Sequence, residues 1–328
     1  MIKVTLLSRV AIPKACVAIA FALFCFCPNA ALAGGPECMT SYYRAKSPTC
    51  VDDILALFRQ APPNSGSDPA TIIGFLAYLL KDSAHERDRI LKAEPSEYVK
   101  SLKLVSLYRA GLPELAEKFA AANNLLALSE KLRAAHFLAL DAVRPSSSPG
   151  DNDLLIGAYM ASGDTTFIRR ILENYSSADD GMVGDAFRIG FMTSKFGTSL
   201  APKGRENVTL QVACAKYECK ADQTKLFRVM TLATAIWSLQ SLANQDKGIE
   251  KTLTDFLARD ARVKTLFAAE QTAFSNYLAA IVVVTTLKDD HTGAEREQAY
   301  AAMGKSASIY ENLGSPAEAF APISHLNK

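Results

Sequence analysis

Four cysteines outside the first 33 residues offer the most reactive chemistry in the sequence: Cys38, Cys50, Cys214 and Cys219. A four-thiolate zinc site is one interpretation of these residues. Their spacings, C-x11-C and C-x4-C, argue against it, because they lack the closely spaced cysteine pair of structural zinc sites. No C-x-x-C redox motif is present. An even cysteine count in an exported chain favours disulfides, and proximity along the chain favours Cys38 with Cys50 and Cys214 with Cys219. The first bridge would contribute about 3 kcal/mol by restricting the unfolded chain.

The four histidines show no spacing that is typical of a metal or catalytic site. His85, His136, His291 and His325 lie far apart, and none belongs to an H-x-x-x-H or H-E-x-x-H motif. We interpret His85 as a surface residue and His136 as packed at the edge of a helix. No G-x-S-x-G motif, P-loop or G-x-G-x-x-G motif occurs. The sequence therefore predicts no catalytic residue, no cofactor and no metal site, although distant helices can still bring two catalytic carboxylates together.

Residues 1–33 have the order of a secretory signal peptide. Three basic residues precede the apolar run 15–27, and the small-residue motif Ala31-Leu32-Ala33 follows. The run is shorter than the roughly 20 residues of a membrane-spanning helix. We expect cleavage between Ala33 and Gly34 and a periplasmic or secreted mature protein without a membrane span. A lipid anchor and an uncleaved signal anchor are the alternatives.

The charge balance argues against nucleic-acid binding. The chain has 36 basic and 34 acidic residues, but three of the basic residues belong to the leader. The mature protein would therefore carry a net charge close to zero and not a basic footprint. No run of more than two Lys or Arg residues occurs in it.

Apolar residues at steps of three and four predict an all-α fold. The stretch 222–243 holds the only Trp, Trp237, and predicts the central helix, with a helix at 262–287 as its partner in the core. Residues 125–143 predict one amphipathic helix. Glycines in the helix expected at 179–196 either permit close helix contact or mark a mobile segment. The linker 144–150 divides the mature chain into lobes of 34–144 and 151–328, unless it is a tight loop within one helical array.

Short glycine-containing turns join pairs of predicted helices at three places. The strings are LYRAGLPELAEKFA, AYMASGDTTFIRRI and IYENLGSPAEAFAP, around Gly111, Gly163 and Gly314. In each, the Gly can adopt the left-handed conformation that ends a helix, and a following Pro, Asp or Ser can begin the next. These units resemble the αα-hairpins of tetratricopeptide-type repeats, although their glycines do not follow a 34-residue period. An αα-hairpin array and an irregular helical bundle are therefore both possible.

A second resemblance and the absence of motifs shape the functional prediction. The strings WSLQSLA and ASGDTTFIRRIL are similar to those of bacterial exported helical proteins of unassigned function. That resemblance implies a class of protein and no role. We expect a non-enzymatic exported protein that binds another, unknown protein through its helical hairpins. The alternatives are a helical carrier of a small molecule or lipid and an enzyme that lacks recognisable motifs.

Overall fold

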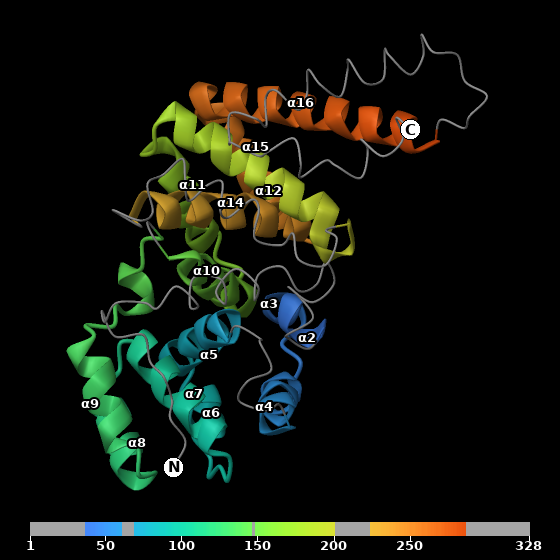
Figure 1. Ribbon diagram of the computed structural model, residues 1–328. Helices are drawn as coiled ribbons and strands as arrows, with labels where there is room; N and C mark the ends of the chain where they lie inside the picture. Colours follow the sequence, from blue (N-terminus) through green and yellow to red (C-terminus); the bar gives the residue numbers. More distant parts are fainter. Residues whose placement is uncertain (1–36, 61–68, 146–147, 201–223, 287–328) are drawn as a thin grey trace. The chain divides into compact units, whose positions relative to one another are not determined.

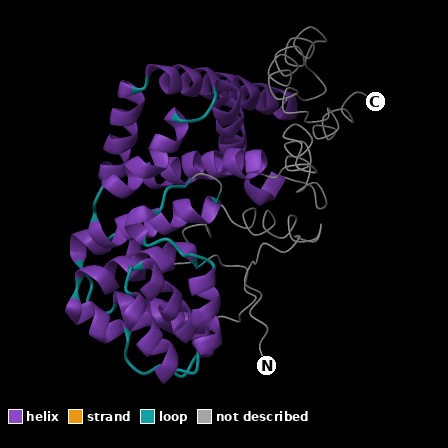
Figure 2. Ribbon diagram, turned by 90° about the vertical axis from the view of Figure 1, so that its left-hand side faces the viewer, coloured by secondary structure: helices purple, strands orange, loops and turns teal. Residues whose placement is uncertain are grey.

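The computed structural model describes residues 37–60, 69–145, 148–200 and 224–286 (Figure 1). These residues contain 14 α-helices, one 3-10 turn (η1) and no strand, which confirms the predicted all-α fold (Figure 2). The helices are α2 (Glu37–Thr40), α3 (Tyr42–Ala45), α4 (Cys50–Gln60), α5 (Ala70–Asp82), α6 (Ala84–Ile90), α7 (Glu97–Arg109), α8 (Pro113–Ala122), α9 (Leu126–Ala134), η1 (Leu140–Ala142), α10 (Pro149–Ser162), α11 (Thr166–Ser176), α12 (Asp180–Leu200), α14 (Thr224–Ala243), α15 (Lys247–Arg259) and α16 (Ala261–Thr286).

The described chain forms two compact units, and the boundary between them falls inside α11. Residues up to Pro145 and Gly150–Ile171 form the first unit, and the residues from Leu172 onward belong to the second. The sequence placed α10 in the C-terminal lobe, whereas the structure packs it with the N-terminal helices. The reason is a close contact with α5, where a Cβ atom on Gly157 would lie 1.8 Å from the carbonyl oxygen of Thr71. A residue without a side chain thus joins helices that are far apart in the sequence.

Side-chain caps and a glycine turn mark the ends of several helices in the first unit. The hydroxyl groups of Ser83 and Ser96 accept hydrogen bonds from the first turns of α6 and α7, as N-caps do. Gly111 has a φ of +73° between α7 and α8, and Pro113 opens α8. The amide of Leu112 donates to the carbonyl of Leu107, which closes the end of α7. The predicted turn between these two helices is therefore confirmed.

The turn between α10 and α11 uses the same chemistry. Gly163 also has a φ of +73°, and its amide donates to the carbonyl of Tyr159. Asp164 then accepts a hydrogen bond from the amide of Thr166 at the start of α11. The third expected pair, around Gly314, lies outside the described residues. The likeness to tetratricopeptide-type repeats remains a prediction.

The single helix predicted over 125–143 is wrong in its second half. Helix α9 ends at Ala134, and His136 follows in the left-handed region with a φ of +48°. The side chain of Arg109 holds the segment that follows, because its Nη1 donates to the carbonyl of Leu138 and its guanidinium lies over the ring of Phe137. His136 is exposed and not packed at a helix edge as expected. A tertiary contact has replaced the local helical pattern.

The described part of the second unit contains the end of α11 and the helices α12, α14, α15 and α16. Helix α14 forms the central contact that the sequence predicted. Its apolar residues are largely buried, but Trp237 itself is only half-buried. Its main partner is α12, not the helix at 262–287 as expected; that helix, α16, packs on α12 and α15. At the α12–α14 contact, a Cβ atom on Gly190 would lie 2.3 Å from a methyl carbon of Ile236. Of the two explanations for these glycines, close helix contact holds at Gly190.

Aromatic rings fill the contact between α12 and α16. Phe187 meets Phe267 edge to face at 5.3 Å, and Phe191 stacks on Phe274 at 5.9 Å between ring centroids. Such pairs add to the burial of their apolar area. Among the described helices, α14 alone is long and apolar enough to cross a membrane by length and composition. Because 61% of that stretch is buried within the protein, it has the properties of a core helix.

Candidate functional site

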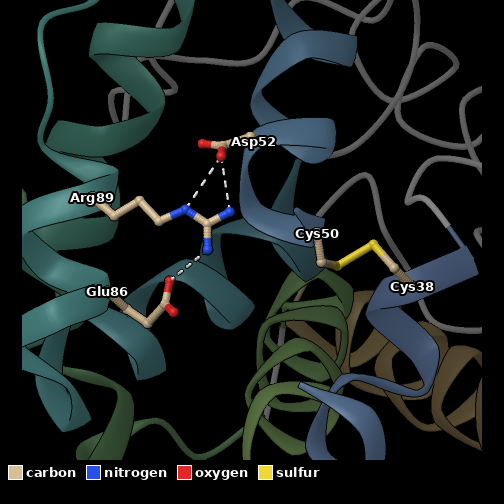
Figure 3. Close-up of a disulfide and its surroundings, with 5 residues drawn as sticks. All are labelled: Cys38, Cys50, Asp52, Glu86 and Arg89. Atoms are coloured by element: carbon tan, nitrogen blue, oxygen red, sulfur yellow. Dashed lines mark hydrogen bonds and ion pairs between the residues drawn. A yellow bond between two sulfur atoms is a disulfide. The ribbon is translucent and has the colours of Figure 1, made fainter. Parts of the chain in front are cut away.

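The Cys38–Cys50 disulfide brings together a group of polar and aromatic side chains that the sequence did not predict (Figure 3). It joins α2 to the first residue of α4, with 5.7 Å between the two Cα atoms, and confirms the first expected bridge. Cys214, Cys219 and the expected cleavage site at Ala33 and Gly34 lie outside the described residues. The disulfide therefore fixes one short segment, residues 37–46, which we call the strap.

The strap packs on the first unit through two adjacent tyrosines. Tyr42 is buried, and its ring meets Phe75 of α5 edge to face at 5.0 Å. Tyr43 contacts Tyr159 of α10, with 5.4 Å between ring centroids. The strap thus covers apolar side chains of both α5 and α10. The sequence indicated only that Tyr42 and Tyr43 lie within the disulfide loop.

An ion-pair network lies next to the disulfide and links α4 with α6. Arg89 reaches Asp52 at 2.9 Å and Glu86 at 3.5 Å, and Figure 3 shows its guanidinium between the two carboxylates. Burial raises the pKa of the Tyr42 hydroxyl, and the charge of Glu86 raises that pKa further. Tyr42 therefore remains protonated at neutral pH. These groups tie the helices around the disulfide together.

A second network is buried between α4, α7 and the loop that precedes α7. The Glu94 carboxylate accepts two parallel hydrogen bonds from Arg59, at 3.1 and 3.0 Å, and lies 3.5 Å from Nζ of Lys103. Burial opposes ionisation of Glu94, but the hydrogen bonds from Arg59 and the Ser96 amide and the charge of Lys103 outweigh it and lower the pKa. The carboxylate is therefore held in its charged form.

Lys103 is the one group of this network whose chemistry resembles that of a nucleophile. Burial lowers the pKa of its ammonium group, only partly opposed by Glu94, as in lysines that form covalent intermediates. However, its side chain is only 2% exposed, and Nζ donates to the carbonyl of Lys92. A substrate could not approach it without unfolding the loop. Lys103 therefore acts as a structural link between α7 and residues 92–94.

A weaker ion pair connects the end of α7 with the first turn of α10. Nη2 of Arg109 lies 3.8 Å from Oδ1 of Asp151. Burial lowers the pKa of Arg109 and raises the pKa of Asp151, and each charge partly opposes the shift of the other. Because Arg109 also holds Phe137 and Leu138, this pair positions the segment after α9.

The second unit contains an arrangement of two carboxylates of the kind that an unrecognised enzyme would need. Arg188 of α12 donates to Asp185 at 2.9 Å and to both carboxylate oxygens of Glu270 on α16, at 2.7 and 2.8 Å. Both acids thus share one guanidinium, a geometry that suits a structural ion pair between α12 and α16. No pair of His and carboxylate meets in the described residues, where His85 and His136 are both exposed. The described residues also hold no group of His, Cys, Asp and Glu that could bind a metal ion.

Three leucines are the exposed large hydrophobic side chains of the described chain. Leu126 and Leu138 lie at the start of α9 and in the turn that follows it, with 55% and 54% exposure. The third, Leu57 of α4, is 47% exposed. The segment 126–138 also exposes alanines 127, 134 and 135. By contrast, Tyr108 and Tyr159, which precede the two glycine turns of the described chain, are buried.

Comparison with known protein families, curated proteins and solved structures found no match for this chain. Its own geometry is therefore the basis of any functional assignment. The exposure of Leu138 could not have been identified from the sequence, because it lies beyond the early end of α9. The buried Glu94 and Lys103 gave no sequence signal either, since charged residues are usually solvated.

Proposed function

We propose that this protein is an exported, non-enzymatic helical protein that binds another protein through the surface around α9. This α9 surface comprises Leu126, Leu138 and the exposed alanines between them. Two large apolar side chains, one at the start of α9 and one in the turn that follows it, are each more than half exposed, and this observation carries the proposal. Exposed apolar groups framed by polar residues are typical of sites where proteins bind each other.

Export is supported by two independent features. The basic, apolar and small-residue order of residues 1–33 is that of a secretory leader. The Cys38–Cys50 disulfide suits an oxidising compartment, where such bonds persist. Both features support a periplasmic or secreted location, and the proposal predicts that N-terminal sequencing of the exported protein begins at Gly34.

A non-enzymatic role is supported by what the buried charged groups do. Glu94, Asp185 and Glu270 each bind an arginine of the same unit, and Lys103 binds a backbone carbonyl. These contacts stabilise helix packing and leave the charged atoms occupied. The aromatic contacts of α12 and α16 are filled by phenylalanine rings, an arrangement that favours a protein-binding scaffold over a carrier of apolar ligands.

Site-specific photo-crosslinking in the producing cells tests this proposal. A photoreactive phenylalanine analogue replaces Leu126 or Leu138 in separate variants, and Leu57 is the matched control because it is an exposed leucine on another helix. The proposal predicts one crosslinked protein shared by positions 126 and 138 and absent at position 57. A Leu138→Asp substitution should abolish the crosslink from position 126. Equal crosslinking at all three positions, or none at 126 and 138, would refute the proposal.

A further inference from the structure

The strap is a separable element whose contacts with the rest of the first unit are well defined. Besides the disulfide, Tyr42 packs against Phe75 and Tyr43 packs against Tyr159. The hydroxyl of Tyr159 also lies 3.4 Å from that of Tyr43. These contacts belong to side chains, so an identical strap from another molecule could make them equally well. An element of this kind is suited to exchange between copies.

The surface against which the Tyr43 ring packs, which we call the seat, includes Gly163. A Cβ atom on Gly163 would lie 2.5 Å from Cδ2 of Tyr43. The ring therefore occupies space that only a glycine leaves open. Gly163 thus has two roles, because it also supplies the left-handed turn between α10 and α11.

The residues that join the strap to α4 have the properties of a hinge. Lys46 lies in the left-handed region, with φ 42° and ψ 51°, a conformation that is unfavourable for a residue with a side chain. Pro48 and Thr49 follow it and are exposed. An extended hinge would release the strain at Lys46, so the closed form of the strap is held against a local backbone preference.

The disulfide encloses this hinge, because residues 46–49 lie between Cys38 and Cys50. While the bond is intact, the strap cannot extend away from α4 of its own chain. When both thiols are free, the hinge can extend and the strap can reach the same seat on a neighbouring molecule. There its tyrosines would pack as they do on their own chain, and the left-handed conformation of Lys46 would be relieved.

We propose that the strap docks on a second copy of this chain when the disulfide is open, and that the Cys38–Cys50 bond keeps the protein a closed monomer. Opening requires a thiol reductant: two glutathione molecules reduce the bond to two thiols and leave as one glutathione disulfide. In the exchanged pair, one glutathione disulfide accepts two electrons for each new bond. Cys38 of one molecule then joins Cys50 of the other, with release of two glutathione molecules.

Isotope mixing tests the exchange directly. The mature chain, with Cys214→Ser and Cys219→Ser to remove other thiols, is prepared with 14N and with 15N. Equal amounts are mixed, reduced with glutathione, concentrated and reoxidised with glutathione disulfide. The proposal predicts a covalent dimer on a non-reducing gel, whose Cys38–Cys50 peptides carry one 14N and one 15N half in about half of all cases. Peptides that are always uniformly labelled, at every protein concentration, would overturn it.

Two further variants distinguish strap exchange from random pairing of thiols in a reduced and partly unfolded protein. Lys46→Gly removes the strain of the closed hinge and should lower the dimer yield at least about fivefold, because Gly adopts positive φ readily. Tyr43→Ala removes the ring that occupies the seat and should abolish the mixed peptide, while the disulfide still forms within each chain. A mixed-peptide yield that both variants leave unchanged would show random thiol pairing and would overturn the proposal.

Discussion

The two units bring helices together in different ways, and the contacts of α5 with α10 and of α12 with α14 show the difference. In the first unit, Gly74 and Gly157 let two helix backbones touch, because a Cβ atom on either would lie within 2 Å of a carbonyl oxygen of the other helix. In the second unit, a Cβ atom on Gly190 would lie 2.3 Å from a side-chain methyl of Ile236 and 2.9 Å from the carbonyl oxygen of Ala233. The nearest backbone carbonyl oxygen is thus about 1 Å farther from Gly190 than from Gly74, so the backbones of α12 and α14 leave more room for an alanine.

The other stabilising contacts follow the same division. In the first unit, a disulfide and two ion networks connect helices of 4 to 14 residues. In the second, the long helices α12 and α16 pack through phenylalanine rings and through the ion pairs of Arg188 and Arg262. Short helices bury little apolar area each, so they depend more on specific links. The comparison predicts that single substitutions act most strongly in the first unit.

The largest expected effect comes from adding one methyl group between α5 and α10. Gly74→Ala would place Cβ 1.9 Å from the carbonyl oxygen of Leu154, so the two helices must separate. We expect a loss of about 3 to 4 kcal/mol in the free energy of unfolding, measured by urea denaturation. Gly190→Ala is the matched control in the second unit. Its loss should be smaller, about 1 to 2 kcal/mol, because the nearest backbone oxygen lies farther from Gly190 than from Gly74 and alanine favours the helix. Equal losses would contradict the distinction between the two contacts.

Substitution of Glu94 in its network with Arg59 and Lys103 should destabilise the protein nearly as much, whereas substitution of Lys103 should not. Glu94→Gln leaves Lys103 buried without an anionic partner and should cost about 3 kcal/mol. Lys103→Met is the control, because Arg59 still neutralises Glu94 with two hydrogen bonds. We expect that variant to lose about 1 kcal/mol or less. Thermal unfolding followed by circular dichroism measures both, and a larger loss in Lys103→Met would show that the lysine dominates the network.

A single buried hydroxyl in the second unit should have a smaller effect. Tyr175 donates to the backbone carbonyl of Leu232 on α14, and full burial raises the pKa of its hydroxyl. Tyr175→Phe removes this hydrogen bond and keeps the ring stacked on Phe187. The expected loss is about 1 to 2 kcal/mol in urea denaturation. No change would indicate that the phenol is not hydrogen-bonded in the folded protein.

Acid should weaken the first unit through the same Glu94 network. Its pKa is lower in the folded state than in the unfolded state, so ionised Glu94 stabilises the protein fully above the unfolded value near 4.3. That contribution is lost as the pH falls through the folded pKa. A stability titration from pH 6 to pH 2 should therefore show a shallower acid loss in Glu94→Gln than in the wild type. Parallel curves would mean that Glu94 is not coupled to folding.

The sequence predicted the elements better than their partners. The all-α fold, the first disulfide and the turns at Gly111 and Gly163 follow from local signals, namely periodicity, cysteine spacing and turn residues. The end of α9 could not be predicted, because Arg109 from another helix holds Phe137 and Leu138. Trp237 is only half-buried although its helix is central, because an aromatic residue on a wide apolar surface need not lie at the centre of that surface.

The candidate site was harder to predict, since it depends on contacts between distant residues. Nothing near Glu94 or Lys103 in the sequence indicates that they meet Arg59, 35 residues earlier than Glu94. The exposure of Leu126 and Leu138 likewise follows from tertiary packing. Gly74 and Gly157 are ordinary helix glycines until the helices that contain them are brought together.

Hydrogen exchange measured by mass spectrometry tests most directly whether the two units are held by different contacts. The double variant Cys38→Ser/Cys50→Ser is compared with the wild type under native conditions, peptide by peptide. If the disulfide anchors the strap and α4, protection should fall strongly at residues 37–60 and remain unchanged in α12 and α14. Equal loss of protection in α12 and α14, or full protection of the strap in the double variant at a concentration where it is monomeric, would contradict the account.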